Sequence, residues 1–245
     1  MVQDNLPFQL DKTDELSLWR AKTFYEKEPE TLAWLDFFSN KTDVRMLCDV
    51  GANIGIYSLY WLSLNRGNRA VAFEPFDINF ELLQKNLRQN EYLQRCRTFP
   101  CAIADHDGVQ SYTLSDNRPG SSGFALTTTG NLSEDINLIK TLRLDSLFPS
   151  LAECMILKID VDGSDFSALK SSQGLLIKKS IISVLIESTP EEHRKIEKFL
   201  ANYALFPDSR FNEMIPHSTV RRVATLKFER NIVYTHRDFI RKQLN

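Results

Sequence analysis

One segment constrains the fold of this chain more than any other, because a short apolar run stops at a glycine and passes directly into a helical pattern. The run, Arg45 to Val50 (R-M-L-C-D-V), ends at Gly51, and apolar residues then recur at helical spacing as far as Arg66-Gly67. A strand, a tight turn and a helix in that order form the first half of a βαβ unit, whose two strands lie parallel. The segment therefore predicts an α/β protein with a mostly parallel sheet.

The alternation of strand and helix patterns continues along the chain, as a doubly wound sheet requires. Ala70 to Phe73 reads as a buried strand closed by Glu74-Pro75, and Asp77 is placed to cap the helix that follows. Further strands are predicted at Thr98 to Ala104, Val109 to Leu114, Met155 to Val161 and Ile181 to Ile186, and further helices at Ser164 to Leu176 and Glu191 to Tyr203.

The N-terminal part of the chain lacks this alternation. From Leu16 to Phe38 the spacing is loosely helical and is broken at Glu28-Pro29, where the proline can open a second helix. We therefore expect residues 1–40 to form a helical cap and residues 41–245 to form a Rossmann-like domain.

Two other stretches also depart from the repeat. Phe206 to Phe211 and Val220 to Tyr234 are strand-prone without a helix between them, which predicts a C-terminal antiparallel hairpin at one edge of the sheet. Ser115 to Gly130 is rich in glycine, serine and threonine, which predicts a long loop near a binding face.

Composition excludes several classes of protein. The 30 Lys and Arg residues nearly balance the 32 Asp and Glu residues, so the chain lacks the positive excess that binding a nucleic acid backbone exploits. The start of the chain lacks the features of a signal peptide, and there is no apolar stretch of about 18 residues, which predicts a cytoplasmic protein without a membrane span. The spacing of cysteines and histidines predicts reduced core thiols and no metal site; the cysteines are Cys48, Cys96, Cys101 and Cys154.

The polar residues that end the predicted strands carry the chemistry, because doubly wound sheets bind ligands beyond the carboxyl ends of their strands. The first strand runs into D-V-G-A-N-I-G, Asp49 to Gly55, in which Gly51 permits a tight turn and Gly55 a close approach of helix and ligand. By itself this loop also fits a plain turn between a strand and a helix. It is neither a triphosphate-binding P-loop nor a complete Gly-x-Gly-x-x-Gly, since Asn53 stands where the middle glycine would be.

Glu74 strengthens the cofactor hypothesis. It lies at the end of the second strand, about twenty residues beyond the glycines, where a carboxylate can accept hydrogen bonds from both ribose hydroxyls of an adenosine cofactor. The alternative is an acid at a helix N-terminus before Pro75. Asp49 and the amides of the loop can bind a methionyl group, whereas a pyrophosphate needs a close approach of the backbone at the middle glycine. The loop therefore favours S-adenosylmethionine.

Three charged residues at the end of the fourth strand are the catalytic candidates. Lys158, Asp160 and Asp162 alternate at the period of a strand, which would place them on one side near the carboxyl edge. A salt-bridged structural cluster is the alternative interpretation. Glu187, at the end of the next strand, is placed to join them.

With these motifs in view, the chain resembles the FkbM family of S-adenosylmethionine-dependent methyltransferases. The resemblance rests on D-V-G-A-N-I-G, F-E-P at Phe73 to Pro75 and L-K-I-D-V-D-G at Leu157 to Gly163, and extends to E-P-E-T-L, T-L-R-L-D-S-L and V-L-I-E. It implies a class I methyltransferase fold and mostly O-methylation, with acceptors that include sugars of glycans and hydroxyls of secondary metabolites. The family usually has Glu where this chain has Asp162, which shortens that carboxylate by one methylene.

These observations assign predicted roles to individual residues. Asp160 is the expected base, with Lys158 tuning it and Glu187 as the second candidate. The expected S-adenosylmethionine site comprises Asp49, Gly51, Asn53, Gly55, Tyr57, Ser58, Glu74, Pro75, Phe76, Ala102 and Asp160. A small-molecule or glycan acceptor is expected to contact Asp162, Asn117, Ser121 and Ser122. The alternative for the last three residues is a solvated turn.

Two other functions remain open at this point. A nicotinamide-dependent oxidoreductase would use Glu74 equally well for its ribose, and a non-catalytic module would bind the cofactor without turnover. The sequence does not indicate an oligomeric state.

Overall fold

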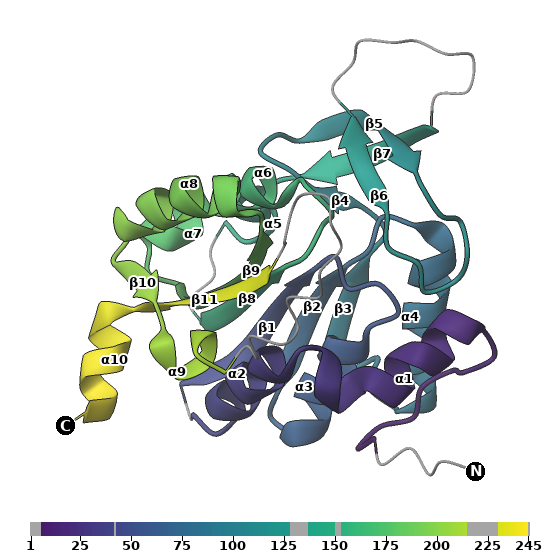
Figure 1. Ribbon diagram of the computed structural model, residues 1–245, viewed down its shortest axis with the longest axis horizontal. Coiled ribbons are helices and arrows are strands. Elements are labelled where there is room, and N and C mark those ends of the chain that lie inside the picture. Colours follow the sequence, from purple (N-terminus) through teal and green to yellow (C-terminus); the bar gives the residue numbers. More distant parts are fainter. Residues whose placement is uncertain (1–5, 42, 128–136, 150–152, 215–229, 245) are drawn as a thin grey trace.

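The computed structural model describes residues 6–41, 43–127, 137–149, 153–214 and 230–244, and its centre is a seven-stranded sheet (Figure 1). The strand order is β10-β11-β9-β8-β1-β2-β3. The strands are β1 (Val44–Val50), β2 (Arg69–Phe73), β3 (Cys96–Phe99), β8 (Cys154–Ile159), β9 (Ile181–Ser188), β10 (Leu205–Pro207) and β11 (Arg230–His236).

Strand directions in this sheet confirm the predicted fold class. Strands β3, β2, β1, β8 and β9 pair in parallel, whereas β11 runs antiparallel to both β9 and β10. The protein is thus a doubly wound α/β protein whose last two strands form an antiparallel pair at one edge. Of the segment predicted to form the second hairpin strand, residues 220–229 lie outside the described residues.

Helices cover both faces of the sheet (Figure 1). Residues of α1 to α4 share one hydrophobic core, and residues of α5 to α8 share the other. The helices are α1 (Glu15–Lys27), α2 (Pro29–Ser39), α3 (Ile56–Leu64), α4 (Asp77–Gln89), α5 (Leu144–Leu147), α6 (Asp165–Lys170), α7 (Gln173–Ile177), α8 (Pro190–Ala201), α9 (Ser209–Asn212) and α10 (Arg237–Leu244). None of the helices in the described part of the chain has the length and apolar character needed to cross a bilayer.

The N-terminal helices pack directly on the sheet. Pro29 opens α2 immediately after Glu28, as expected from a proline in the first turn of a helix. Trp34 of α2 is fully buried, and its indole Nε1 donates a hydrogen bond to Ser183 Oγ of β9 at 2.9 Å.

At the junction between α1 and α2, Glu28 Oε2 accepts a hydrogen bond from Asn231 Nδ2 of β11 at 3.1 Å, and Asn231 pairs with Glu187 at the carboxyl end of β9. The junction therefore lies close to the carboxyl edge of the sheet. The boundary at residue 40 between a cap and a domain stays a prediction.

A second, smaller sheet stands beside the carboxyl edge of the main one, and it corrects two predictions. Its order is β4-β7-β5-β6, with β4 (Ala102–Ile103), β5 (Gly108–Leu114), β6 (Phe124–Thr127) and β7 (Asn137–Leu142). The single strand predicted from Thr98 to Ala104 is wrong, because Pro100 has no N–H for the ladder and the chain changes sheets there. The loop predicted from Ser115 to Gly130 contains β6, and its residues 128–130 lie outside the described residues.

Three further predictions about local structure are wrong. The helix expected from Ser164 to Leu176 is divided into α6 and α7, since the hydroxyls of Ser171 and Ser172 bond back to carbonyls of the preceding turn. Asp77 is the first residue of α4 and not its cap. The strand expected from Phe206 to Phe211 is limited to β10, because the chain turns into α9 at Ser209. The sequence patterns also did not predict α10.

The strand expected to run as far as Val161 ends at Ile159, so strand alternation does not orient the last two of the three charged residues. Asp162 has a φ of 45°, in the left-handed region. Asp160 and Asp162 therefore lie in the turn beyond β8, and their positions depend on that turn.

Candidate active site

A cavity of about 200 Å³ opens at the carboxyl edge of the main sheet. Its wall is formed by the residues that follow β1, β2 and β8, by the end of β9, by α1 and by the small sheet with its loop. This is the position where doubly wound sheets bind ligands.

Gly51 marks the point where β1 turns under the cavity. Its φ is +81°, and a Cβ built on it would lie 1.8 Å from the backbone oxygen of Asp160. No rotamer change relieves such a contact, since the backbone fixes the position of a Cβ as well as that of the carbonyl oxygen. The cofactor loop is therefore packed against the turn after β8, and only glycine fits between them.

Glu74 lies at the end of β2 and is almost completely buried. Its Oε2 accepts the backbone N–H of Asn53 at 2.7 Å, and its Oε1 accepts that of Phe76 at 2.9 Å. Burial raises the pKa of Glu74 to about 7. Since a carboxylate has about four acceptor positions, two remain for a ligand after these bonds.

Asp49 and Ser58 lie behind the loop and not on the cavity wall. Ser58 Oγ donates to Asp49 Oδ2 at 2.6 Å, and Asp49 Oδ1 is buried without a hydrogen-bond partner among the described residues. Burial raises the pKa of Asp49. This acid joins the end of β1 to α3 and places an unsatisfied acceptor beneath the cavity.

Lys158, Asp160 and Glu187 are brought together by the neighbouring strands β8 and β9. Lys158 Nζ is 2.8 Å from Asp160 Oδ2; the lysine side chain is 1% exposed and that of the aspartate 31%. Burial alone would raise the pKa of Asp160, but the adjacent ammonium outweighs it and lowers that pKa to about 2. Glu187, at the end of the neighbouring strand β9, belongs to the same cavity wall as Asp160.

Tyr57 and Glu28 complete this cluster. The Lys158 ammonium lies 5.0 Å from the centroid of the Tyr57 ring. Burial and then the charge of Glu28, at the junction of α1 and α2, raise the pKa of the Tyr57 hydroxyl. Burial opposes the charge on Lys158, yet the carboxylates of Asp160, Asp49 and Glu28 outweigh it and hold the lysine pKa above its usual value. Lys158 is therefore a permanent buried cation.

The loop between β5 and β6 is tied to the cofactor loop by side chains. Asn53 Nδ2 donates to the carbonyl of Ser121 at 2.7 Å, and Asn79 of α4 donates to the same oxygen at 3.1 Å. Asp162 Oδ2 accepts the N–H of Gly123 at 2.7 Å. These bonds hold the loop over the cavity.

Apolar residues line the side of the cavity next to the small sheet. Ala102 and Ile103 of β4 and Phe124 and Leu126 of β6 contribute to this wall together with Phe76. A planar apolar group such as a purine is the kind of ligand that such a surface accepts.

The structure brings most of the predicted site residues to the cavity. On its wall are Gly51, Asn53, Glu74, Pro75, Phe76, Ala102, Ser121, Ser122, Asp160, Asp162 and Glu187. Tyr57, Ser58, Asp49, Gly55 and Lys158 support it from behind. Asn117 is exposed and is not on the wall, so its role stays a prediction without support from this geometry.

Sequence reasoning missed six polar residues of the wall: Arg20, Lys27, Glu28, Asn79, Asp116 and Ser164. Glu28 alone had a signal, because it begins the E-P-E-T-L segment. The others come from helix faces and from loops whose positions depend on packing.

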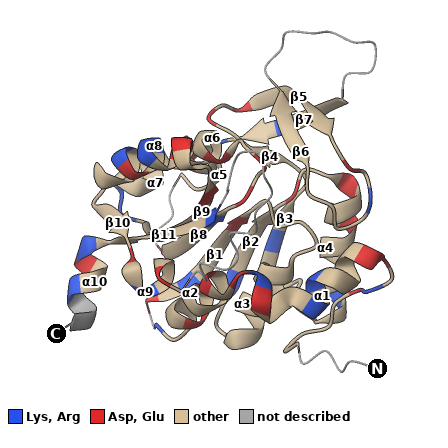
Figure 2. Ribbon diagram, viewed as in Figure 1, with Lys and Arg blue, Asp and Glu red and all other residues tan. Residues whose placement is uncertain are grey.

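Carboxylates outnumber cations on this wall, and acidic residues gather near the carboxyl ends of the central strands (Figure 2). The acids are Glu28, Glu74, Asp116, Asp160, Asp162 and Glu187, and among the described residues the cations are Arg20 and Lys27. The field in the cavity thus favours cationic groups.

The chain is similar to known methyltransferases. The FkbM methyltransferase domain matches residues 49–206. Methyltransferase sdnD of Sordaria araneosa is 25% identical over 202 residues, which cover 69% of this chain and 77% of that protein. Methyltransferase 1 of Beauveria bassiana is 22% identical over 146 residues, which cover 52% of this chain and 58% of that protein.

Among solved structures, the precorrin-6y C5,15-methyltransferase of Geobacter metallireducens has 11% sequence identity and a TM-score of 0.46, with 94% of this chain and 93% of that chain covered. The N-terminal domain of human METTL16 in complex with SAH has 12% identity and a TM-score of 0.45, with 93% and 75% covered.

Proposed function

The chain belongs to the FkbM methyltransferase family and is a methyltransferase, and from that premise we propose that it transfers the methyl group of S-adenosylmethionine to a hydroxyl oxygen of a neutral acceptor. A sugar of a glycan or a small metabolite is the acceptor that fits the proposal. Family membership also favours this reaction over nicotinamide-dependent oxidation.

One observation carries the proposal. The buried carboxylate of Glu74 and the partly exposed carboxylate of Asp160 belong to the wall of the same cavity, on either side of the glycine loop along the sheet. Glu74 keeps two free acceptor positions, as many as the vicinal hydroxyls of a ribose need. The acidic wall and Asp49 beneath it suit a ligand that carries a sulfonium and an ammonium group.

The residues present therefore fit S-adenosylmethionine. When bound, the cofactor supplies a methyl group on a positively charged sulfur. In the proposal Glu74 holds the ribose, the backbone around Gly51 holds the methionyl chain, and Ala102 and Phe76 flank the adenine. Asp49 and Ser58 keep the loop in place from behind.

Asp160 is the proposed partner of the acceptor. Lys158 keeps its carboxylate ionised, so it accepts a hydrogen bond from the acceptor hydroxyl and orients the oxygen. A pKa of about 2 makes Asp160 a weak base. A hydroxyl oxygen that is gaining a methyl group becomes strongly acidic, however, and a weak carboxylate base suffices to take its proton.

The charge of the cavity restricts the acceptor. Of the six carboxylates of the wall, Glu28, Asp116 and Asp160 each have a cation beside them, yet acids still outnumber cations around the cavity. This excess of acids disfavours a phosphate or carboxylate near the reacting oxygen and favours a neutral acceptor. A cavity of this charge distinguishes sugars and alcohols from acidic metabolites.

Titration calorimetry with S-adenosylhomocysteine and with NAD tests the cofactor. We expect S-adenosylhomocysteine alone to bind and to stabilise the fold by about 2.7 kcal/mol at a hundredfold excess over its dissociation constant. Because Glu74 has a pKa of about 7 and the ribose needs its ionised form, the affinity is expected to rise with pH and to be about tenfold weaker near pH 6 than near pH 8.

The matched variant for this experiment is Glu74→Gln, whose amide oxygen keeps one of the two backbone contacts. It is expected to lose about 1.5–3 kcal/mol of binding free energy, as for a hydrogen bond to a charged group, and to bind without pH dependence. Unchanged affinity in this variant would reduce Glu74 to a structural anchor of the loop. Binding of NAD in place of S-adenosylhomocysteine would overturn the cofactor assignment.

Asp160→Asn tests the catalytic role, because it keeps the shape of the side chain and removes the charge. With a panel of neutral sugars and alcohols as acceptors and release of S-adenosylhomocysteine as the signal, we expect turnover to fall at least about a hundredfold. Affinity for S-adenosylhomocysteine should stay within a few-fold of wild type. The control is Asp238→Asn, an exposed acid on α10. Near-normal turnover in Asp160→Asn would transfer the proposed role to Glu187.

A further inference from the structure

We propose that Arg20 of α1 binds the carboxylate at the methionyl end of the cofactor, an inference that rests on the proposed use of S-adenosylmethionine. The cofactor carries one anionic group, and a cavity wall with six carboxylates repels it unless a cation receives it. Among the described residues of the wall, Arg20 and Lys27 are the only candidates.

Lys27 already has a partner. Its Nζ is 2.7 Å from Glu28 Oε1, and its side chain is 42% exposed. Moving it to a ligand would leave Glu28, which is buried, without its closest cation. The cost of an unpaired buried carboxylate disfavours that exchange.

Arg20 is in a different position. Its Nε donates to the carbonyl of Gly120 at 3.0 Å and its Nη2 to Ser122 Oγ at 3.3 Å, and both acceptors are uncharged. No ion pair joins it to another described residue. A guanidinium has five N–H donors, so three stay free, and two of them lie side by side in the geometry that a carboxylate accepts.

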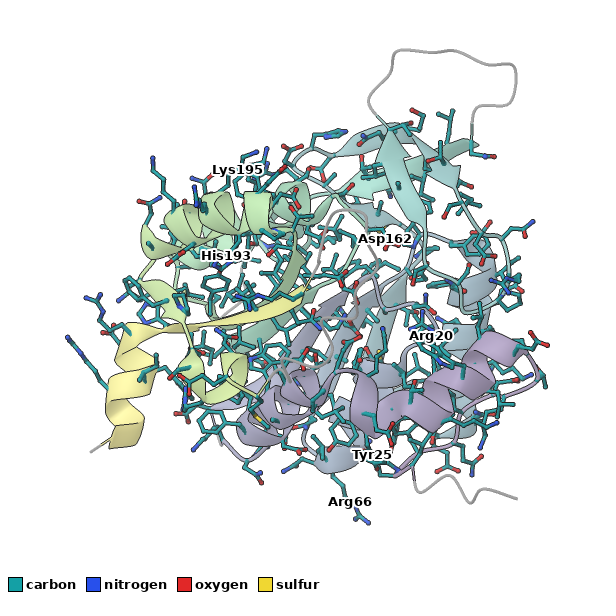
Figure 3. The ribbon with its side chains drawn as sticks, in the orientation of Figure 1. Arg20, Tyr25, Arg66, Asp162, His193 and Lys195 are labelled. Carbon is teal, nitrogen blue, oxygen red and sulfur yellow. The ribbon has the colours of Figure 1, made fainter. Side chains whose placement is uncertain are left out.

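Arg20 lies on the same cavity wall as Glu74 and Asp162. Its charge lowers the pKa values of Glu74 and Asp162 against the larger effect of burial, so the guanidinium lies near both carboxylates. Figure 3 shows Arg20 on the side of α1 that faces Asp162. Glu74 belongs to the proposed ribose site and Asp162 to the turn that packs on Gly51. A ligand extending from Glu74 along the glycine loop therefore brings its other end within reach of Arg20.

The bonds to Gly120 and Ser122 also hold the guanidinium in place before a ligand arrives. A planar group fixed by two hydrogen bonds loses little freedom when it binds a carboxylate. The competing interpretation is that Arg20 only fastens the loop, in which case it would affect all ligands of the cavity alike.

The test compares two ligands by calorimetry. One is S-adenosylhomocysteine, and the other is S-adenosyl-3-thiopropylamine, which keeps the adenosine, sulfur and amine and lacks only the carboxylate. Wild type is expected to prefer the first by about tenfold or more. In Arg20→Gln the affinity for S-adenosylhomocysteine is expected to fall at least about tenfold, while that for the amine stays within about threefold, so that the preference disappears. Arg20→Lys keeps the charge without the planar fork and should retain part of the preference.

Lys27→Gln is the matched control, since it removes the other cation of the wall. Equal weakening of both ligands in Arg20→Gln, or loss of the preference in Lys27→Gln instead, would overturn the proposal while the cofactor assignment stands. Failure of wild type to bind either ligand would count against the proposed function itself. Unfolding curves of each variant verify that the fold is retained.

Discussion

Replacing Lys158 by methionine is expected to destabilise the protein by about 3–5 kcal/mol, the usual cost of removing one partner of a buried ion pair. Methionine fills a similar volume, so the loss arises from charge and not from a cavity. The carboxylate of Asp160 would lose an ammonium at 2.8 Å, and Asp49 and Glu28 would lose the cation that they share with it. Urea unfolding near pH 7 measures the effect.

The pH dependence of this deficit has a definite sign. Lys158 lowers the pKa of Asp160 from 3.8 to about 2, so the stability that it contributes is present above pH 3.8 and is lost as the pH falls through about 2. The difference between wild type and Lys158→Met should therefore shrink in acid. The double variant Lys158→Met with Asp160→Asn should be more stable than Lys158→Met alone, because it carries one uncompensated charge fewer.

The matched control is Lys170→Met, which removes the cation of the ion pair with Asp105. Both side chains of this ion pair are more than one third exposed, and exposed ion pairs contribute at most about 1 kcal/mol to stability. A deficit in Lys158→Met as small as that of Lys170→Met would show that the charged cluster is hydrated and does not depend on this lysine.

Gly51→Ala is expected to cost about 2–5 kcal/mol of stability, the sum of left-handed backbone strain and of overpacking, and to abolish detectable binding of S-adenosylhomocysteine. The new Cβ would lie 1.8 Å from the backbone oxygen of Asp160, so either the glycine loop or the turn after β8 must move. Both belong to the proposed cofactor site. Thermal unfolding and calorimetry measure the two effects.

Gly163→Ala separates the cost of left-handed backbone strain from the cost of a steric clash. Its φ is +91°, close to that of Gly51, but a Cβ at that position meets nothing within 4 Å. It should therefore cost only about 1–2 kcal/mol, the part due to the left-handed conformation. Equal losses in the two variants would contradict the close packing of the loop against the turn.

Local patterns in the sequence determined much of this protein. The helical spacing after Gly51 and the apolar runs predicted the parallel sheet, because burial of one helix face and of whole strands leaves a periodic signature. Glu74 and the glycine loop could be placed at the carboxyl edge, since parallel strands all end there. The motifs also pointed to the FkbM family, to which the chain belongs.

Other features were decided only by the tertiary structure. Pro100 diverts the chain into a second sheet, and no periodicity indicates where that sheet will stand. Arg20 and Ser122 are separated by 102 positions in the chain, and Asn53 and Ser121 by 68, yet both pairs are hydrogen-bonded. These contacts depend on how α1 and the loop between β5 and β6 pack over the sheet. The sequence around an arginine on a helix surface is the same whether that surface faces solvent or a cavity. Only the packing of α1 on the sheet therefore made Arg20 part of the cavity wall.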